Sequence, residues 1–491
     1  MGEKSFGEFG KIQKRKIGIS SVIKFLFIVS ILIAIPKAFS GWREFYISIA
    51  EHEAPQISFK NPPVGIGLAP VVLDFIVKDP LSGLDKVSVE IKTEDGTTSL
   101  FNKSYPKRLA EDLIQVEINP SKLKLKGKLA LISIKAFDRS IWSSVEKLEA
   151  EIPIDLKPPK ILPISSTNYL TVGGVGLVFY KILGENPEVS GVMLEQELYY
   201  GFPASYLDQA LLSNKNLYFA FFPVPLFCNE QSCDFKIFAR DIVGNKSQVN
   251  FANELSTKKY STLDLELDAN YVSSYLPEAI KEYNKQMKGA VQDFVELTAS
   301  DSTPLAMSTL LKDSILEQAA KVLFSRPSST RLWEDVFFYP GGSVNKPRFG
   351  ETVSYTLLGE TLGQTKSPGI FFASRTGTDV RAANSGRVIF SGEFGLLGKS
   401  IIIDHGFGLS TVYSNLSELS KREGDKVGKG EIIGLSGSSG LATKSGCMYQ
   451  VRMHGQAVRP EEWWDPGWIK NRIFGQLNEA KEAVGVSQIQ Q

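Results

Sequence analysis

The sequence has almost no net charge and very little histidine or cysteine. Its 491 residues include 55 basic and 54 acidic side chains, a balance of +1. Proteins that follow a phosphate backbone usually carry a strong excess of Lys and Arg, so we expect no nucleic-acid partner. There are only three histidines, His52, His405 and His454, which leaves few candidates for an imidazole-rich metal site. The length exceeds what one hydrophobic core usually supports, so we expect several domains.

The three cysteines leave two interpretations open. Cys228 and Cys233 are close enough in sequence to close a small disulfide in an oxidising compartment. They are equally compatible with two reduced, buried thiols. Cys447 has no partner in either interpretation.

The N-terminal region combines basic and apolar residues in the order typical of exported proteins. The basic residues of 1–16 precede an apolar run at 17–35 that is interrupted only by Lys24. Such a run can just span a bilayer, with the basic side in the cytoplasm. We therefore expect a cytoplasmic leader at 1–16 and a transmembrane anchor at 17–40. A cleaved signal segment is the alternative, because 38–40 resembles a cleavage site.

Either interpretation exports the rest of the chain. The expected location is a single-pass protein of a bacterial inner membrane, with its main part in the periplasm or outside the cell.

A weak internal repeat of about a hundred residues follows. Ser82-Gly83-Leu84 recurs as Ser190-Gly191-Val192, and residues 134–138 recur as 237–241. Between these marks apolar and polar residues alternate with period two, which is typical of half-buried strands. The pattern predicts two tandem immunoglobulin-like β-sandwiches, which usually serve as spacers or docking surfaces. The predicted sandwiches cover residues 55–155 and 156–255.

Apolar residues at helical spacing between 265 and 324 predict a helical connector at 256–332. The connector either links domains as a helical hairpin or binds a partner through an amphipathic face. Short strands and glycine turns return at 333–468. The tail at 469–491 is expected to be a short helix or disordered.

Several glycine-containing motifs recur in one order within 333–468. They are Ala382–Val388, Ile403–Gly408, Gly424–Val427, Gly430–Gly434 and Ser436–Gly440. In order and spacing they resemble the β-sheet domain of LytM/lysostaphin-type zinc metallopeptidases, which are peptidoglycan endopeptidases. The resemblance extends to membrane-anchored members that carry immunoglobulin-like domains. It implies a mostly β, multidomain protein that ends in a LytM-type domain of the duplicated-hybrid-motif kind.

The family's chemistry uses a zinc ion held by two His and one Asp, with a water in the open position. The first two ligands form a His-x-x-x-Asp motif, and the third ends a His-x-His strand whose first His is catalytic. Another catalytic His stands in a Tyr-x-His-Leu segment. Carried over to this chain, the ligand positions hold Ser367, Phe371 and Met448, and the catalytic positions hold Asn415 and Gly446. The resemblance therefore implies a degenerate domain with no catalytic residue, no metal ligand and no cofactor.

The remaining candidates do not restore a site. His405 lies in an Asp-His-Gly turn that active members carry without using it as a ligand, and His454 lies six residues beyond Met448. Cys447 is out of phase with positions 446 and 448, and Asp379 falls in a loop. A rebuilt zinc site is not expected.

The sequence therefore favours a pseudoenzyme. We expect a non-catalytic cell-envelope protein that binds peptidoglycan or regulates a cell-wall hydrolase. Two alternatives stay open: an active peptidoglycan metalloendopeptidase with an atypical site, which would need zinc, and a structural envelope assembly protein. The apolar replacements allow either a collapsed scaffold or a groove that holds a peptide without cutting it.

Overall fold

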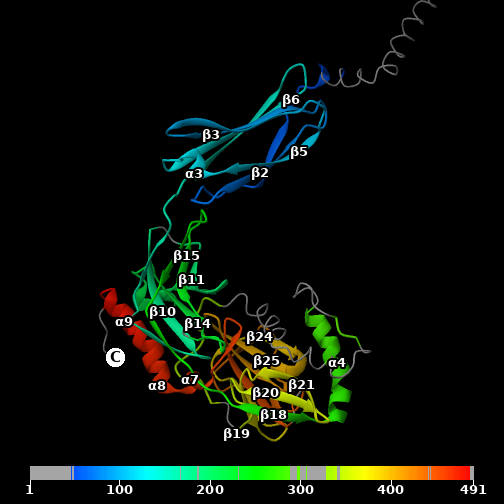
Figure 1. The fold of residues 1–491 in the computed structure, drawn as a ribbon, viewed down its shortest axis with the longest axis vertical. Helices are drawn as coiled ribbons and strands as arrows, with labels where there is room; N and C mark the ends of the chain where they lie inside the picture. Colours follow the sequence, from blue (N-terminus) through cyan, green and yellow to red (C-terminus); the bar gives the residue numbers. More distant parts are fainter. Residues whose placement is uncertain are drawn as a thin grey trace, which may run out of the picture. The chain divides into compact units, whose positions relative to one another are not determined.

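The computed structural model describes most of the chain. The described residues are 46, 49–165, 167–184, 187–229, 232–287, 296–298, 306, 328–339, 343–440, 442 and 444–486. The protein is mostly β and divides into two compact units, Met1–Lys157 and Pro158–Gln491 (Figure 1).

The expected location as a single-pass inner-membrane protein has to be corrected. Within the described ranges, no helix is long and apolar enough to cross a membrane. The proposed leader at 1–16 and anchor at 17–40 lie outside the described residues.

The first unit consists of two antiparallel sheets around one core. One sheet has the order β1 (Gln56–Asn61), β2 (Val71–Lys78) and β5 (Glu111–Ile118). The other has the order β4 (Gly96–Ser104), β3 (Leu84–Thr93), β6 (Leu129–Asp138) and β7 (Val145–Pro153). Alternate residues of the strands point inward, so that Leu73, Phe75 and Val77 of β2 are fully buried. A single turn of helix, α3 (Pro120–Leu123), begins where the Asn119 side chain accepts a hydrogen bond from Lys122 N.

The second unit begins with another pair of sheets. One has the order β13 (Phe202–Pro203), β14 (Leu217–Pro223), β10 (Val175–Leu183) and β8 (Lys160–Pro163). The other has the order β12 (Glu197–Tyr200), β11 (Val189–Leu194), β15 (Phe235–Arg240) and β16 (Lys246–Asn250). Two short turns, η1 (Ala204–Tyr206) and η2 (Gln209–Leu211), connect β13 to β14, and β17 (Asn253–Ser256) pairs in parallel with β9 (Asn168–Thr171). Cys228 and Cys233 are joined by a disulfide after β14.

The segment expected to be a helical connector contains both strand and helix. β18 (Thr262–Leu267) pairs in parallel with β20 (Thr352–Leu357), which pairs with β21 (Glu360–Lys366). Helix α4 (Ala269–Met287) follows and buries Val272, Leu276 and Ile280 on one face. The second apolar stripe of the connector, at 310–322, lies outside the described residues.

An eight-stranded sheet dominates the C-terminal part. Its order is β19 (Ser343–Asn345), β22 (Ile370–Ala373), β30 (Gly446–Met453), β26 (Leu409–Ser414), β25 (Lys399–Gly406), β24 (Gly386–Glu393) and β28 (Lys426–Val427), with β31 (Gln456–Val458) also on β30. A smaller sheet has the order β23 (Asp379–Arg381), β29 (Ile432–Ser436) and β27 (Leu416–Leu419). The turn η3 (Gly395–Leu397) connects β24 to β25.

Residues 461–483 form consecutive helical segments that return to the β-sheets of 160–256. They are α7 (Glu461–Trp464), α8 (Pro466–Trp468), the π-helix η4 (Ile469–Phe474) and α9 (Gly475–Ala483). Ile473, Leu477 and Ala480 are buried in the core of the second unit. The tail is thus helical through Ala483 and packed against β10 (Figure 1).

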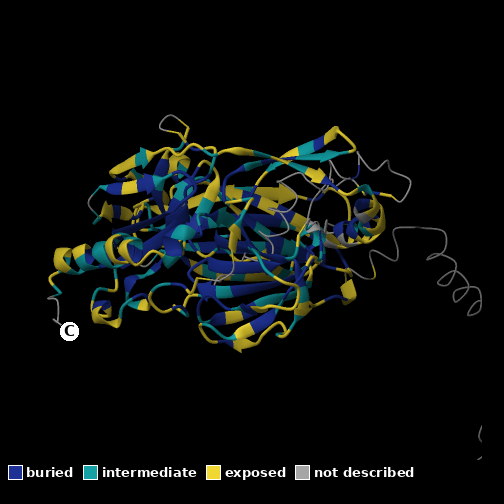
Figure 2. Cartoon of the chain, turned by 90° about the horizontal axis from the view of Figure 1, so that it is seen from below, coloured by how far each residue is buried: buried dark blue, intermediate teal, exposed yellow. Residues whose placement is uncertain are grey.

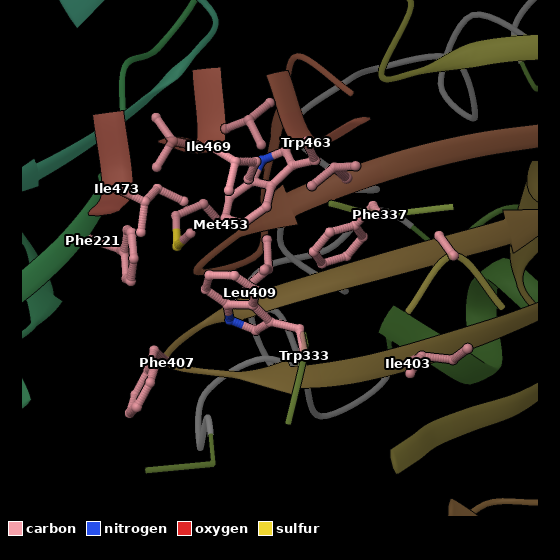
Figure 3. Packing of buried hydrophobic residues seen from close by; sticks show 14 of the residues in the cluster. Phe221, Trp333, Phe337, Ile403, Phe407, Leu409, Met453, Trp463, Ile469 and Ile473 are labelled. Carbon is pink, nitrogen blue, oxygen red and sulfur yellow. The ribbon is translucent and has the colours of Figure 1, made fainter. Parts of the chain in front are cut away.

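One continuous hydrophobic core joins the parts of the second unit. It contains Phe219 and Phe221 of β14, Met453 of β30 and Trp463 of α7, all with at most 1% of their surface exposed. Figure 3 shows Phe221, Met453 and Trp463 in this core together with Trp333 and Phe407. In Figure 2 the central strands are largely buried, and exposed residues lie mainly on outer loops and helices.

The side chain of Phe407 packs between the C-terminal sheet and the sheets of 160–256. It occupies the two-residue turn between β25 and β26, where Phe407 and Gly408 both have positive φ, as a tight hairpin with matching twist requires. The ring of Phe407 lies 5.1 Å from the ring of Phe202 and 4.9 Å from that of Phe219. Its burial makes the sheets of 160–256 and the C-terminal sheet parts of one folded body.

Polar contacts also connect the C-terminal part of the second unit to the sheets of 160–256. The Nε2 of His454 donates to the carbonyl of Phe221 at 3.0 Å, and burial lowers the pKa of His454 to about 4. Glu462 accepts a hydrogen bond from Val175 N at 3.1 Å, and burial raises its pKa to about 7. A Cβ at Gly174 would lie 2.3 Å from Glu462 Oε1, so the absence of a side chain there admits this carboxyl.

We expect Phe407→Ala to lower the free energy of unfolding of the second unit by about 3–5 kcal/mol, because it empties a packed aromatic site. Phe407→Leu keeps apolar volume at the same backbone position and should cost much less. Hydrogen exchange should show β14 and β26 losing protection together in Phe407→Ala, with β3 of the first unit unchanged. Loss of protection confined to β26 would contradict a shared core.

Candidate functional site

The strand register brings most of the predicted site positions together. In the pairing of β22 with β30, Phe371 lies opposite Met448 and Ala373 opposite Gly446. On the other side of β30, Met448 lies opposite Ser414, the last residue of β26, and Asn415 follows directly. The resemblance therefore selected positions that share one patch of the large sheet.

Gly446 and Phe371 interlock. A Cβ at position 446 would lie 2.7 Å from Cζ of Phe371 and 2.3 Å from the carbonyl oxygen of Phe372. Both distances are shorter than any van der Waals contact, and the second involves backbone that cannot rotate away. Phe371 is only 6% exposed, so its ring fills the space beside residue 446. An imidazole does not fit at this position unless the neighbouring strand moves.

Ser367 lies in the turn between β21 and β22. Its hydroxyl donates to the carbonyl of Gly369 at 3.1 Å, and its backbone N–H donates to the backbone carbonyl of Glu351 at 2.8 Å. The side chain is 2% exposed. Ser367 therefore stabilises its own turn.

Asn415 holds two loops through its backbone and side chain. Its backbone N–H donates to the carbonyl of Leu397 at 2.9 Å. Its side-chain Nδ2 donates to the carbonyls of Ser439 at 2.9 Å and Leu397 at 3.3 Å. The residue adopts φ +63°, a conformation that Asn tolerates better than most residues. With both amide hydrogens engaged by the protein, Asn415 has no donor left for a substrate carbonyl.

The loop that Asn415 holds is also bound to helix α4. The hydroxyl of Tyr275 donates to the carbonyl of Gly395 at 2.7 Å, and Phe394 belongs to the buried cluster under the helix. The turn η3 is thus fixed by α4 on one side and by Asn415 on the other. A displacement of α4 would therefore move the turn that Asn415 binds.

The residues present do not fit a zinc ion. Phe371, Gly446 and Met448 offer no carboxylate, imidazole or thiolate, and zinc prefers those donors. Cys447 belongs to the hydrophobic core, and burial raises the pKa of its thiol to about 12, which keeps it neutral. Asp379 is exposed on β23 and pairs with Arg381 at 3.0 Å.

His405 has a structural environment that its motif did not reveal. Its Nδ1 donates to the carbonyl of Ser385 at 2.7 Å, and its Nε2 accepts from the hydroxyl of Thr411 at 2.8 Å. The Thr411 hydroxyl lies 3.2 Å from that of Tyr413, which accepts from Ala383 N at 2.6 Å. Complete burial lowers the pKa of His405 to about 4. The imidazole is therefore a neutral link in a buried network that connects β25 and β26 to the loop before β24.

The sequence contained a signal for this network. Thr411 and Tyr413 are two residues apart on one strand, so their side chains share a face with each other. By contrast, the buried contacts of Glu462 and His454 are made with residues of 160–256 that are distant in sequence. No local sequence pattern therefore predicts them.

We expect a pH-dependent stability difference between wild type and His405→Gln. A histidine with a depressed pKa in the folded state contributes stability that is complete above about pH 6.5 and is lost as the pH falls toward 4. The stability advantage of wild type over the variant should therefore shrink across this window in urea unfolding. His52→Gln, at an exposed position of the first unit, serves as the control. A difference that stays constant from pH 7 to pH 4 would contradict a buried neutral imidazole.

Comparison with known proteins identifies a family for the C-terminal part of the chain. Residues 365–460 match Peptidase family M23. Over 119 residues the chain is 36% identical to the DD-carboxypeptidase/endopeptidase Mpg of Neisseria meningitidis, a match that covers 22% of this chain and 27% of that protein. Over 103 residues it is 38% identical to Stage II sporulation protein Q of Bacillus subtilis, covering 20% of this chain and 36% of that protein.

A third relative is the murein hydrolase activator EnvC of Escherichia coli, 27% identical over 146 residues, covering 30% of this chain and 33% of that protein. Among solved structures, a peptidase M23 protein from Pseudomonas aeruginosa aligns with a TM-score of 0.38 at 18% identity, covering 60% of this chain and 95% of that one. The chain spans about a quarter to a third of the length of these curated relatives.

Proposed function

Because residues 365–460 form a domain of peptidase family M23, we propose that this chain is a non-catalytic cell-envelope protein that binds peptidoglycan or regulates a cell-wall hydrolase. A cell-wall role is supported by relatives that include both a DD-carboxypeptidase/endopeptidase and a murein hydrolase activator. One of these relatives is an endopeptidase and the other is an activator of a hydrolase. The geometry of the site is therefore needed to choose between a catalytic and a non-catalytic function for this chain.

The observation that carries the non-catalytic choice is the interlock of Gly446 with Phe371. The resemblance places a catalytic histidine at 446, and the structure leaves no room there for a Cβ. The proposed ligand position 371 is filled by the ring that takes this room. Asn415, at the other catalytic position, spends its amide hydrogens on Leu397 and Ser439. The replacements thus support each other as a packed arrangement without metal.

The same arrangement supports a surface for binding. Met448 is partly exposed beside the buried Phe371, so an apolar side chain remains accessible at the centre of the patch. A flexible thioether adapts well to varied contacts. We infer that a peptide or a hydrolase surface contacts this face through Met448.

The other domains are proposed to position this face. The sheets of the first unit and those of 160–256 have the strand counts of sandwiches, and we propose that both are immunoglobulin-like modules. On this proposal 55–155 and 156–255 act as spacers or docking surfaces, 256–332 as a connector, 333–468 as the degenerate domain and 469–491 as a tail.

The purified full chain should contain no stoichiometric zinc and should not digest peptidoglycan sacculi, because no described residue of the patch is a good zinc donor. Elemental analysis and assay of released muropeptides test this directly. About one zinc per chain together with chelator-sensitive digestion would overturn the proposal in favour of an endopeptidase with an atypical site.

Met448→Glu should abolish sedimentation with sacculi, or stimulation of a purified cell-wall hydrolase, because it places a charge in the apolar contact. The matched control is Leu358→Glu, the same kind of change at a residue that is 81% exposed in the turn between β20 and β21. Circular dichroism should show both variants folded. If both variants bind and stimulate like wild type, the patch is not the functional surface, and the alternative of a structural assembly protein gains support.

A further inference from the structure

Three carboxyl groups are buried together at one end of the first unit. Glu51, Asp79 and Asp138 are only 5%, 2% and 2% exposed, and one oxygen from each lies within 4.8 Å of the others. Glu51 precedes β1, Asp79 follows β2 and Asp138 ends β6, so the cluster joins segments that are distant in sequence. Buried carboxylates are rare unless they are paired with a cation.

The protein supplies only neutral donors to this cluster. Glu51 accepts from Ser82 N at 2.7 Å, and Asp79 accepts from the N–H groups of Leu81 and Gly83 at 3.1 Å each. Among the described residues, none of the three carboxylates forms an ion pair with Lys, Arg or His. Like charges at this spacing repel each other strongly when they are removed from water.

Asp138 provides an independent sign of a missing partner. Its Oδ1 accepts from the N–H and the hydroxyl of Ser140, at 3.2 and 2.9 Å. Its Oδ2 is buried and has no hydrogen-bond partner. A carboxylate oxygen left unpaired in the interior is costly, so such an atom points to a ligand.

The repeat within the chain offers an internal comparison. Residues 134–138 correspond to 237–241, so Asp241 is the counterpart of Asp138. Asp241 is also buried, at 5% exposed, but both of its oxygens are satisfied. Its Oδ1 accepts from Val243 N and Asn245 N, and its Oδ2 accepts from Asn245 Nδ2 at 2.8 Å. In the second module Asn245 therefore satisfies the carboxylate of Asp241. In the first module the corresponding Asp138 lies instead beside two more carboxylates, Glu51 and Asp79.

We propose that Glu51, Asp79 and Asp138 bind one calcium ion. Calcium takes oxygen ligands at about 2.3–2.6 Å, so oxygens up to about 5 Å apart can share one ion. Magnesium, with ligands at about 2.0–2.1 Å, needs them closer together. Zinc prefers nitrogen and sulfur donors, which none of these side chains offers. Backbone carbonyls and water complete the coordination.

The ion would fix the segment that leads into β1. Trp142 Nε1 already donates to the carbonyl of Ile49 at 3.0 Å, and the Trp142 ring lies 5.2 Å from that of His52. Residues 49–52 are therefore held against the loop that follows β6 at one point. A calcium ion shared by Glu51 and Asp138 would add a second, stronger point, so calcium binding would hold residues 49–52 more firmly against the first unit.

The test is calcium titration of the chelator-treated full chain by isothermal calorimetry, with thermal unfolding of the same samples. Wild type should bind about one Ca²⁺ and unfold at a higher temperature when it is bound. Asp138→Asn should weaken binding at least roughly tenfold, since it removes one charged ligand. It should also unfold at a higher temperature than wild type in chelator, because it relieves repulsion within the cluster.

Asp241→Asn is the matched control in the corresponding aspartate, and it should keep the calcium response of wild type. Glu51→Gln tests the site independently should Asp138→Asn fail to fold, and it should lose binding in the same way. The proposal would be overturned if wild type showed no binding heat with millimolar calcium. It would also be overturned if all variants gave the same calorimetric and thermal responses to calcium. Neither outcome bears on the M23 domain, so the calcium site and the proposed function stand or fall separately.

Discussion

The second unit depends on the burial of Phe407 between the C-terminal sheet and the sheets of 160–256. Its ring contacts Phe202 and Phe219, and the same core continues through Trp333 to Trp463 and the terminal helices. Burial of this kind is non-directional and contributes in proportion to apolar area, so a large shared core resists separation of its parts. The M23 domain therefore has a fixed orientation to its neighbouring module.

The same core also supports the patch formed by Phe371, Asn415, Gly446 and Met448. Asn415 and the turn η3 are linked to α4 through Tyr275, and the strands that carry Phe371 and Met448 belong to the same sheet as the hairpin of Phe407. The patch is thus rigidly supported from several sides. A surface that is pre-organised in this way loses little conformational entropy when it binds, which favours the binding function proposed above.

The strands of the two repeats and the presence of an M23-type domain were predictable from the sequence, because both depend on local sequence patterns. Period-two alternation predicted the strands of both repeats, and ordered glycine motifs predicted an M23-type domain whose register brings 371, 446 and 448 together. The repeat also aligned Asp138 with Asp241 before their different environments were known. These features depend on neighbours along the chain or on one strand pairing.

The rest depends on contacts between distant residues. The connector was expected to be helical from 265, but Leu265 and Leu267 lie in β18, because pairing with β20 overrides the local spacing. The terminal residues 469–483 show little hydrophobic contrast of their own, and their helix is fixed by packing against β10. The membrane assignment rested on a basic leader followed by an apolar run, and within the described residues no helix is long and apolar enough to cross a membrane. The clash at Gly446 could not be anticipated, since it requires the position of the Phe371 ring.

The interlock of Gly446 and Phe371 also limits how this domain can change. A histidine introduced at 446 alone would collide with the Phe371 ring and with the Phe372 carbonyl, and an aspartate introduced at 371 alone would leave a buried charge without a partner. Each single step toward a metal site lowers stability before any metal can bind. A zinc site at these positions would therefore require residues 371 and 446 to change together, with a shift of the neighbouring strand.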